Sequence, residues 1–418
     1  MKKILLAASA LIATTGLYSS TALADTPVVT LGGYSNFEAG YAVQDMDNRT
    51  AAGGTDSTHA NQRPQAFRND DQIDVKINGK SDAFAYGGEI DLLADTTTDV
   101  QGRGFNASKT FVYLQCAKTG MRLELGSNVG ADGAMKVDAG TIAHATGGID
   151  GDWSYFANAR EPFVAQTDLP LGYGNLEAAT QDYLGNHTEE NLNKITLYTP
   201  RYAGFQAGVS YLPDQTNTGQ GTALLPTPNP AGPNRTKNNA GLSANIVTGG
   251  ISYDHKFGDV GIAAAVTGEE GKAQNRQFDG LEAWNAGAKA TYKGASLAGS
   301  YGNWGSSNNF KAAHSKDTWY WDIGAAYETG PWGASITYMQ SQFDCGTGAG
   351  AGNNEYCTDI APSTYKNKFS NVSIGADYKL APGLTPYAEV SFFDENAGDF
   401  DARDNKGTVT LLGTQLNF

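Results

Sequence analysis

The chain has 418 residues, a formal net charge of −15, 52 glycines and 11% aromatic residues, and only 17% of its residues are charged. So many glycines leave little room for long helices, whereas Tyr, Phe, Trp and Thr favour strands. An exported acidic chain binds nucleic acid poorly, so we expect no nucleic-acid partner.

The first 24 residues are predicted to be a secretory signal peptide. Lys2 and Lys3 form a basic start, an apolar run follows from Ile4 to Ile12, and Ala22-Leu23-Ala24 is an A-x-A cleavage site. The alternative, a membrane-spanning helix, is disfavoured because the apolar run is too short. Residues 25–418 are therefore expected to be the exported, mature domain.

From residue 28 onward the chain repeats one module, in which a strand, a tight turn, a second strand and a long polar loop follow one another. Sixteen strands are predicted: Val28–Val43, Asp71–Gly79, Ala83–Leu93, Ser108–Lys118, Met121–Ser127, Asn193–Pro200, Phe205–Leu212, one ending at His255, Val260–Thr267, Ala283–Tyr292, Ala295–Trp304, Thr318–Glu328, Pro331–Gln340, Phe369–Leu380, Leu384–Phe393 and Lys406–Phe418. Alternately short and long connections and an even strand count predict an all-β fold, a closed antiparallel transmembrane β-barrel. The alternative is a water-soluble β-sandwich or repeat protein. It is disfavoured by Trp and Tyr at the ends of apolar faces, such as Trp284 and Tyr292, which suit an aromatic girdle.

A segment of about sixty residues, from Asn128 to Glu190, separates the fifth and sixth predicted strands and is far longer than an ordinary connection. We expect it to fold into the barrel and to narrow the pore. Asn128 to about Asp152 is the part expected in the lumen, and Trp153 to Glu190 is expected to rise to the rim or to pack against the wall. The acidic residues expected at the constriction are Asp132, Asp138, Asp150 and Asp152.

Basic residues are expected on the wall that faces this segment. The alternation of side chains along a strand directs four of them inward: Lys76, Arg122, Lys194 and Lys289. Lys109 is ambiguous, because its strand is apolar on both sides. Cations opposite carboxylates would tune ion preference across a narrow aqueous gap without catalysis. For any single basic residue, a solvated charge or a local salt bridge is the alternative.

The acidic segment also contains a weak calcium-loop pattern. Its oxygen-bearing residues have the offsets of such a loop: Asp150, Asp152, Ser154, Asn158 and Glu161. However, Tyr155 stands where that loop needs glycine, and no helices flank it. An acidic loop that hydrogen-bonds its own backbone is the favoured interpretation.

The three cysteines favour structural roles. Cys345 and Cys357 lie within one glycine-rich segment, so a loop disulfide is expected in an oxidising compartment, with two free thiols as the alternative. Cys116 lies in a predicted strand and is expected to pack as a small apolar residue. Enzyme signatures such as G-x-S-x-G, H-E-x-x-H and a Walker sequence are absent, and the five histidines are scattered. We therefore expect no enzymatic activity, no cofactor and no metal cluster.

The chain as a whole resembles the general diffusion porins of Gram-negative bacteria. The resemblance is carried by the signal peptide, the strand count, Gly147-Gly148-Ile149-Asp150-Gly151-Asp152, the run from Tyr198 to Gln206 and the final Phe418. It implies a homotrimer of sixteen-stranded barrels in the outer membrane, in contact with lipid and lipopolysaccharide. It also implies a third loop whose acidic residues face a basic cluster, and a terminal Phe418 that signals to the barrel-assembly machinery.

The predicted function is passive diffusion of ions and small hydrophilic solutes, with a preference for cations because carboxylates are abundant. One alternative is a substrate-selective channel for sugars or peptides, which requires aromatic side chains in the lumen; Tyr198 and Tyr320 are predicted to point inward. Another alternative is a surface adhesin or phage receptor that binds through its long loops.

Overall fold

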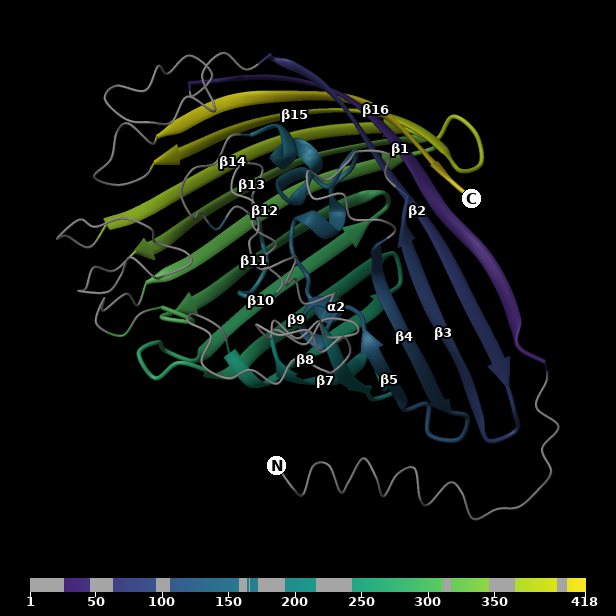
Figure 1. Cartoon of the computed structure of the whole chain (residues 1–418). Coiled ribbons are helices and arrows are strands. Elements are labelled where there is room, and N and C mark those ends of the chain that lie inside the picture. The colour runs from purple at the N-terminus through teal and green to yellow at the C-terminus, as the bar shows by residue number, and fades with distance from the viewer. Residues whose placement is uncertain are drawn as a thin grey trace, which may run out of the picture.

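The chain forms a closed antiparallel barrel of sixteen strands (Figure 1). The computed structural model describes residues 26–45, 63–94, 106–157, 164, 166–171, 192–215, 243–309, 311, 317–345, 365–396 and 404–418. The strands are β1 (Val28–Gln44), β2 (Gln65–Lys80), β3 (Phe84–Leu93), β4 (Asn106–Cys116), β5 (Arg122–Ser127), β6 (Asn193–Tyr198), β7 (Phe205–Asp214), β8 (Ser243–Phe257), β9 (Val260–Ala273), β10 (Leu281–Tyr292), β11 (Ala295–Gly305), β12 (Thr318–Thr329), β13 (Trp332–Cys345), β14 (Tyr365–Tyr378), β15 (Leu384–Asn396) and β16 (Asn405–Asn417). Each strand pairs with the next, and β1 pairs with β16, so the predicted fold and strand count are confirmed.

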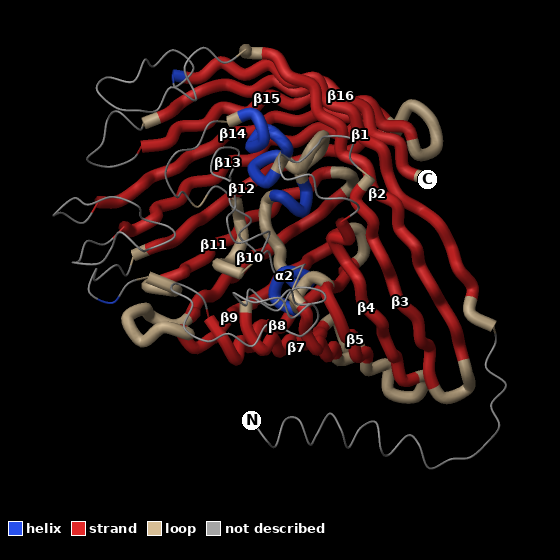
Figure 2. The backbone as a smooth tube through the Cα atoms, viewed as in Figure 1, coloured by secondary structure: helices blue, strands red, loops and turns tan. Residues whose placement is uncertain are grey.

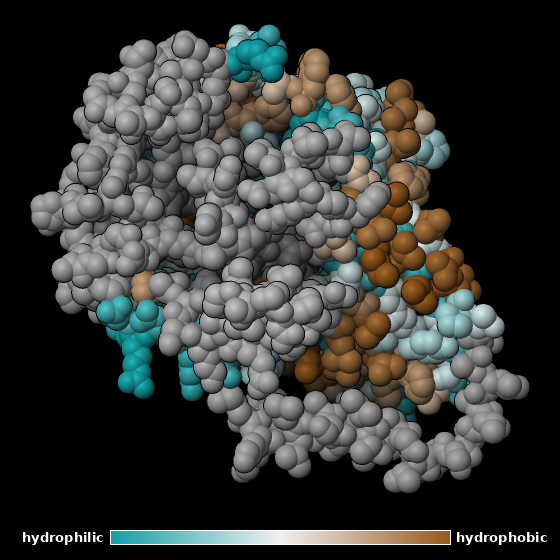
Figure 3. Space-filling view, viewed as in Figure 1, coloured by the Kyte–Doolittle hydropathy of each residue, from teal (hydrophilic) through white to brown (hydrophobic). Residues whose placement is uncertain are grey.

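The strands alternate between a polar inner face and an apolar outer face. On β10, Trp284 is 47% exposed on the outside, whereas the neighbouring Asn285 is buried inside. Figure 3 shows hydrophobic side chains gathered on the outer surface over β1 to β4. Closure leaves no strand edge with unpaired backbone groups, which is the condition for a sheet to lie in hydrocarbon. In the described part of the chain, no helix is long and apolar enough to cross a membrane.

Several strands extend beyond their predicted bounds. β9 continues from Thr267 to Ala273 and β2 begins at Gln65 rather than at Asp71. A strand of 14 residues, at about 3.3 Å per residue and a tilt near 40°, rises ~35 Å along the barrel axis, whereas the apolar band is about 25 Å tall. The extensions therefore lie outside the apolar band. Their residues are polar on both faces, so the sequence there shows no alternating apolar pattern that would predict a strand.

The two ends of the barrel differ. At one end, tight turns join the strands, and Gly258 and Gly330 occupy the left-handed conformation (φ of 63° and 57°) that such turns favour. The last residue lies at this end, because Phe418 exchanges backbone hydrogen bonds of 3.1 Å with Gly33 of β1. The long connections leave from the opposite end. Inside the ring of strands lies one further segment, drawn with its helices in blue in Figure 2.

Candidate functional site: the lumen and its inner loop

The inner loop, residues 128–192, leaves β5, and the residues of it that the structure describes run along the inside of the barrel wall. Its described part contains α2 (Ala131–Met135), η2 (Gly140–Ile142), η3 (Gly148–Asp150) and η4 (Asp152–Phe156). α2 packs on β6 to β9, η2 on β11 and β12, η3 on β13 to β15, and η4 on β16 and β1. The loop therefore covers the wall from β6 round to β1, and β2 to β5 form the side of the lumen that these helices do not line.

Side chains of the wall hold this loop in place by accepting hydrogen bonds from its backbone. Asp322 of β12 accepts from the N–H of Ala139 at 2.7 Å, and Glu389 of β15 accepts from the N–H groups of Thr146 at 3.2 Å and Gly148 at 3.4 Å. Hydroxyl oxygens do the same elsewhere: Ser210 for Ala131, Ser335 for His144 and Thr337 for Ile149. A buried backbone donor without a partner costs free energy comparable to a lost hydrogen bond. Residues 131–157, in the described part of the loop, do not pair with a strand, so these side-chain acceptors take the place of the backbone hydrogen bonds that a strand would form with its neighbours.

The backbone of the loop also lies directly against the sheet. A Cβ atom added to Gly287 of β10 would lie 1.7 Å from the carbonyl oxygen of Val137. No other residue type fits there without moving the loop. Gly287 is therefore a packing position, and its substitution would displace the loop from the wall.

Trp153 anchors η4 of the inner loop to the barrel wall. Its side chain is fully buried, and its ring stacks on Phe369 of β14 (5.9 Å between centroids) and Phe393 of β15 (5.8 Å). Its indole N–H donates to the carbonyl of Ile149 at 3.2 Å. The aromatic part of the loop thus packs against the wall at Trp153.

A charge cluster surrounds Lys136 at the middle of the loop. Its ammonium group contacts the carboxylates of Asp138 (3.0 Å) and Asp168 (2.5 Å). The hydroxyl of Thr167 lies within hydrogen-bond distance of Asp138 (3.0 Å) and Asp150 (2.5 Å), and its one proton is shared between these two carboxylates. The pKa of Lys136 is raised well above its usual value, because attraction by Asp138, Asp168 and Asp150 outweighs the opposing effect of burial. Burial, with the nearby Asp138 and Asp168, raises the pKa of Asp150 to about 6. This cluster joins residues 136–150 of the loop to residues 167 and 168 of the same loop.

Arg68 of β2 contacts the loop at the edge of the covered wall, because β2 is the neighbour of β1. Its guanidinium contacts Glu38 of β1 (3.4 Å), Asp70 (3.0 Å) and Asp152 of the loop (3.7 Å), and the ring of Tyr155 lies 3.9 Å from its central carbon. Burial, together with the hydrogen bond and repulsion from Glu38, raises the pKa of Asp152 to about 9. Arg68 therefore holds η4 against the wall, and Asp152 carries little negative charge near neutral pH.

The inner face of β1 to β5 carries a dense, mixed set of charges. Its carboxylates and cations are Glu38, Arg68, Asp70, Asp74, Lys76, Glu89, Asp91, Lys109, Arg122 and Glu124. Six of these ten are acidic and four are basic. The lysines lie 3.6–3.8 Å from their carboxylates, in loose pairs, whereas Arg122 donates to Glu124 at 2.6 Å. This wall, rather than the loop, holds the larger share of lumen-facing charge among the described residues.

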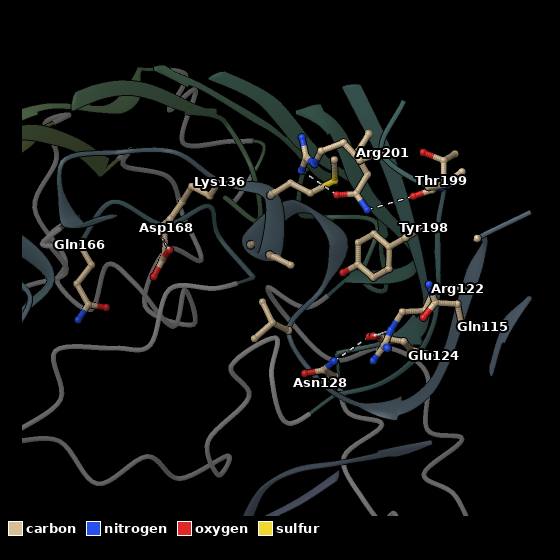
Figure 4. A pocket seen from close by; sticks show the side chains of 17 residues that line it. Gln115, Arg122, Glu124, Asn128, Lys136, Gln166, Asp168, Tyr198, Thr199 and Arg201 are labelled. Carbon is tan, nitrogen blue, oxygen red and sulfur yellow. Dashed lines mark hydrogen bonds and ion pairs between the residues drawn. The ribbon is translucent and has the colours of Figure 1, made fainter. Parts of the chain in front are cut away.

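A cavity of about 1040 Å³ opens between α2 and the short-turn ends of β4 to β7. Figure 4 shows Arg122, Glu124 and Asn128 joined on one side of it, with Lys136 and Asp168 on the other. Tyr198 projects toward the space between them. Both signs of charge and one aromatic ring therefore face the same volume.

The structure places the predicted acidic residues in different surroundings. Asp132 and Asp138 are buried, and Asp150 is turned toward Thr167, whose backbone N–H donates to it at 2.9 Å. Asp152 contacts a cation of the wall, and that cation is Arg68. Two residues of the weak calcium-loop pattern have different partners, since Asp150 is bonded to Thr167 and Asp152 contacts Arg68. Two further residues of that pattern, Asn158 and Glu161, lie outside the described residues.

The predicted basic residues all lie on inner faces of strands, but their surroundings also differ. Lys76 is half-exposed near Asp74 and Glu89, and Arg122 lines the cavity. Lys194 is buried, and its ammonium group donates to the carbonyls of Asn128 and Leu192. Lys289 lies on β10 beside alanines of β9 and β11.

Lys109 and the cysteines complete the placement of predicted residues. In the strand register, Lys109 lies directly opposite Asp91 and forms an ion pair with it, so the side chain of Lys109 points into the lumen. Cys116 is a free thiol at the end of β4. The predicted Cys345–Cys357 disulfide cannot be placed, because Cys357 and the side chain of Cys345 lie outside the described residues, as do the signal peptide and its cleavage site.

Sequence reasoning missed Arg68 and the carboxylates of β3. Arg68 fell within a predicted polar loop because β2 begins six residues earlier than its apolar pattern indicates. The polar alternation of Arg68, Asp70 and Asp74 continues through that boundary and is the signal that could have found it. Glu89 and Asp91 were available as the polar face of a correctly predicted strand.

A closed barrel with an apolar exterior and a charged, hollow interior that is narrowed by an inward loop is a membrane channel. A family model described as Gram-negative porin matches residues 7–398. The chain therefore belongs to the Gram-negative porin family.

Individual proteins are also similar to this chain. The chain is 29% identical over 476 residues to an uncharacterized protein of Rickettsia conorii and 27% identical over 473 residues to one of Rickettsia bellii, with all of both chains covered in each case. A solved structure of a mutant Rh. blastica porin shares 13% identity with a TM-score of 0.53, and the anion-selective porin from Comamonas acidovorans shares 16% with a TM-score of 0.52. Each covers 94% of this chain and 100% of the other, and these two likenesses show a shared fold.

Proposed function

We propose that this outer-membrane channel passes ions and small hydrophilic solutes by passive diffusion and prefers cations. The observation that carries the preference is the wall of β2 to β5, where five carboxylates outnumber four cationic groups on the lumen side. Rings of charged side chains favour counter-ions in an aqueous pore. In the loop, Asp138 forms an ion pair with Lys136, and Asp150 accepts a hydrogen bond from Thr167. The wall of β2 to β5, on which the loop helices do not pack, is therefore the principal source of ion selectivity.

The test is the reversal potential of single channels in a planar bilayer under a KCl gradient. Wild type should show the sign of a cation-selective pore. Glu89→Gln with Glu124→Gln should shift the reversal potential toward that of an anion-selective pore, because two carboxylates leave the wall. Asp259→Asn, in an exposed turn 3.8 Å from Lys293, is the matched control. Absence of conductance would refute the channel, and anion selectivity of the wild type would refute the preference.

The wall and the loop lead us to different expectations for mutagenesis. If Asp150 and Asp152 stood at the selective point of the pore, neutralising both together would shift selectivity toward anions. Given their partners and raised pKa values, we expect a smaller shift than that of the Glu89 and Glu124 double variant. An equal or larger shift would place the loop carboxylates at the selective point of the pore.

A second function, substrate-selective transport, is favoured by one observation. The cavity beside α2 presents two ion pairs, Arg122 with Glu124 on one side and Lys136 with Asp168 on the other, and Tyr198 projects toward the space between them. Such a site suits a small zwitterionic solute, such as an amino acid or short peptide. Saturable block of the ion current by low concentrations of glycylglycine, lost in Arg122→Gln, would support it; block that rises linearly with concentration would exclude it.

We further propose that the protein is a homotrimer in contact with lipid and lipopolysaccharide, that residues 1–24 are removed, and that Phe418 is read by the barrel-assembly machinery. The membership in the Gram-negative porin family supports the proposal. Mass measurement in detergent tests the trimer. A monomeric mass with full conductance would refute it.

A further inference from the structure

Three carboxylates converge on the inner face of β2 and β3, and none of them belongs to the charge cluster around Lys136. In the part of the chain that the structure describes, the ligand oxygens of Asp74, Glu89 and Asp91 all lie within 4.8 Å of one another. Asp74 and Asp91 are directly opposite each other in the strand register. The two strands lie side by side in Figure 1, so a rigid sheet holds all three groups.

Asp91 is the member of this group that lacks a partner for one oxygen. Its side chain is 2% exposed, and its Oδ1 atom is buried with no hydrogen-bond partner among the described residues. The ammonium of Lys109 approaches only the other oxygen, Oδ2, at 3.8 Å. Burying a carboxylate oxygen without a donor is unfavourable. An aqueous cation placed between the three groups would remove that penalty.

The neighbouring side chains leave room for such a cation. Lys76 stands 3.8 Å from Asp74 and 3.6 Å from Glu89, longer than the 2.7–3.2 Å of an N–H···O hydrogen bond. Lys76 is 47% exposed, so it can swing into the lumen. Gln72 donates to Oδ1 of Asp74 at 2.6 Å and thereby fixes the orientation of that carboxylate.

We propose that Asp74, Glu89 and Asp91 form a binding site for a hard divalent cation of the size of Ca²⁺. Calcium takes six to eight oxygen ligands, including carboxylates and waters, and the lumen supplies water for the remaining positions. The bound ion would displace Lys76 and reduce the negative charge of the wall. The external Ca²⁺ concentration would then set the selectivity of the pore.

The first experiment measures binding of CaCl₂ to the folded full-length mature protein in detergent by isothermal titration calorimetry. We expect a dissociation constant on the order of 1 mM, typical of extracellular calcium sites. Asp74→Asn with Asp91→Asn should weaken binding about tenfold or more, since loss of even a supporting group costs 10- to 100-fold in metal affinity. Asp254→Asn, an exposed carboxylate of β8, is the matched control and should bind as wild type does. No heat of binding in wild type, or equal binding in the double variant, would overturn the site.

The second experiment connects the site to conduction. Addition of CaCl₂ should move the KCl reversal potential of wild type toward anion selectivity and leave that of the double variant unmoved. A cation-selective pore that binds no Ca²⁺ would overturn the site and leave the proposed function intact. Ca²⁺ binding by a protein that conducts no current would support the site and overturn the proposed channel function.

Discussion

The two sides of the lumen use the same residue types for different purposes. Along β11 to β15, Asp322 and Glu389 face the inner loop and accept hydrogen bonds from its backbone. Along β2 to β5, Glu89 and Glu124 stand on a wall that the loop helices do not cover. A carboxylate on the covered side fixes structure, whereas one on the bare side contributes charge to the pore. Residue type alone therefore does not identify the residues that select ions.

The largest expected effect is on the covered side, at Lys136. Lys136→Met leaves Asp138 and Asp168 without their shared counter-charge, and removal of one partner from a buried ionic group costs about 3–5 kcal/mol. We expect the loop to undock while the barrel stays closed. Hydrogen exchange followed by mass spectrometry should show lost protection in residues 138–150 and unchanged protection in the strands.

The control for this variant is Lys293→Met. Lys293 lies in an exposed turn, 3.8 Å from Asp259, and both side chains are more than half exposed. Its exchange pattern should match that of wild type. If Lys136→Met also leaves residues 138–150 protected, the charge cluster does not hold the loop.

An intermediate effect is expected at Glu389. Glu389→Leu removes the acceptor of two backbone N–H groups, from Thr146 and Gly148, and hydrogen bonds to a charged group contribute about 1.5–3 kcal/mol each to stability. Exchange protection of residues 146–149 should fall, with η2 less affected. Glu270→Leu replaces an exposed carboxylate of β9 and should have no effect on the loop. If Glu270→Leu also lowered the protection of residues 146–149, the role of Glu389 as the acceptor for these N–H groups would be contradicted.

The barrel was predictable because lipid imposes a period of two on every spanning strand. β10, where Trp284 alternates with Asn285, shows this directly. The same rule failed beyond the apolar band: the stretch from Gly268 to Ala273 reads as a charged loop but belongs to β9. Strand pairing there depends on the backbone ladder, which leaves no apolar pattern in the sequence.

The site was predictable only in part, because alternation gives the face of a residue and not its partner. It placed Lys194 inward, yet the ammonium group of Lys194 binds loop carbonyls. It gave no reason to separate Asp150, held by Thr167, from Asp152, held by Arg68. The path of the inner loop decides these partners, and that path depends on contacts between residues nearly two hundred positions apart, such as Asp322 with Ala139.

A smaller and graded effect is expected from pH. Burial raises the pKa of Asp150 to about 6 and that of Asp152 to about 9, so both carboxyls bind protons more tightly in the docked loop than in an undocked one. Their contribution to docking is therefore complete below about pH 4 and is lost as pH rises through about 6 and then 9. Exchange protection of residues 146–157, corrected for intrinsic rates, should fall from pH 5 to pH 9. Asp152→Asn should remove the upper step, and protection that rises with pH would contradict both assignments.

The smallest expected effect tests whether burial or distance makes the difference between the two kinds of charge. Lys366 approaches Asp317 at 2.5 Å, the same distance as Lys136 to Asp168. However, the side chains of Lys366 and Asp317 are 44% and 54% exposed, against 17% for Lys136. Exposed pairs contribute about 0–1 kcal/mol. Lys366→Met should therefore leave loop protection, thermal stability and reversal potential within error of wild type. A loss as large as that of Lys136→Met would mean that contact distance, and not exclusion of water, decides which charges hold this protein together.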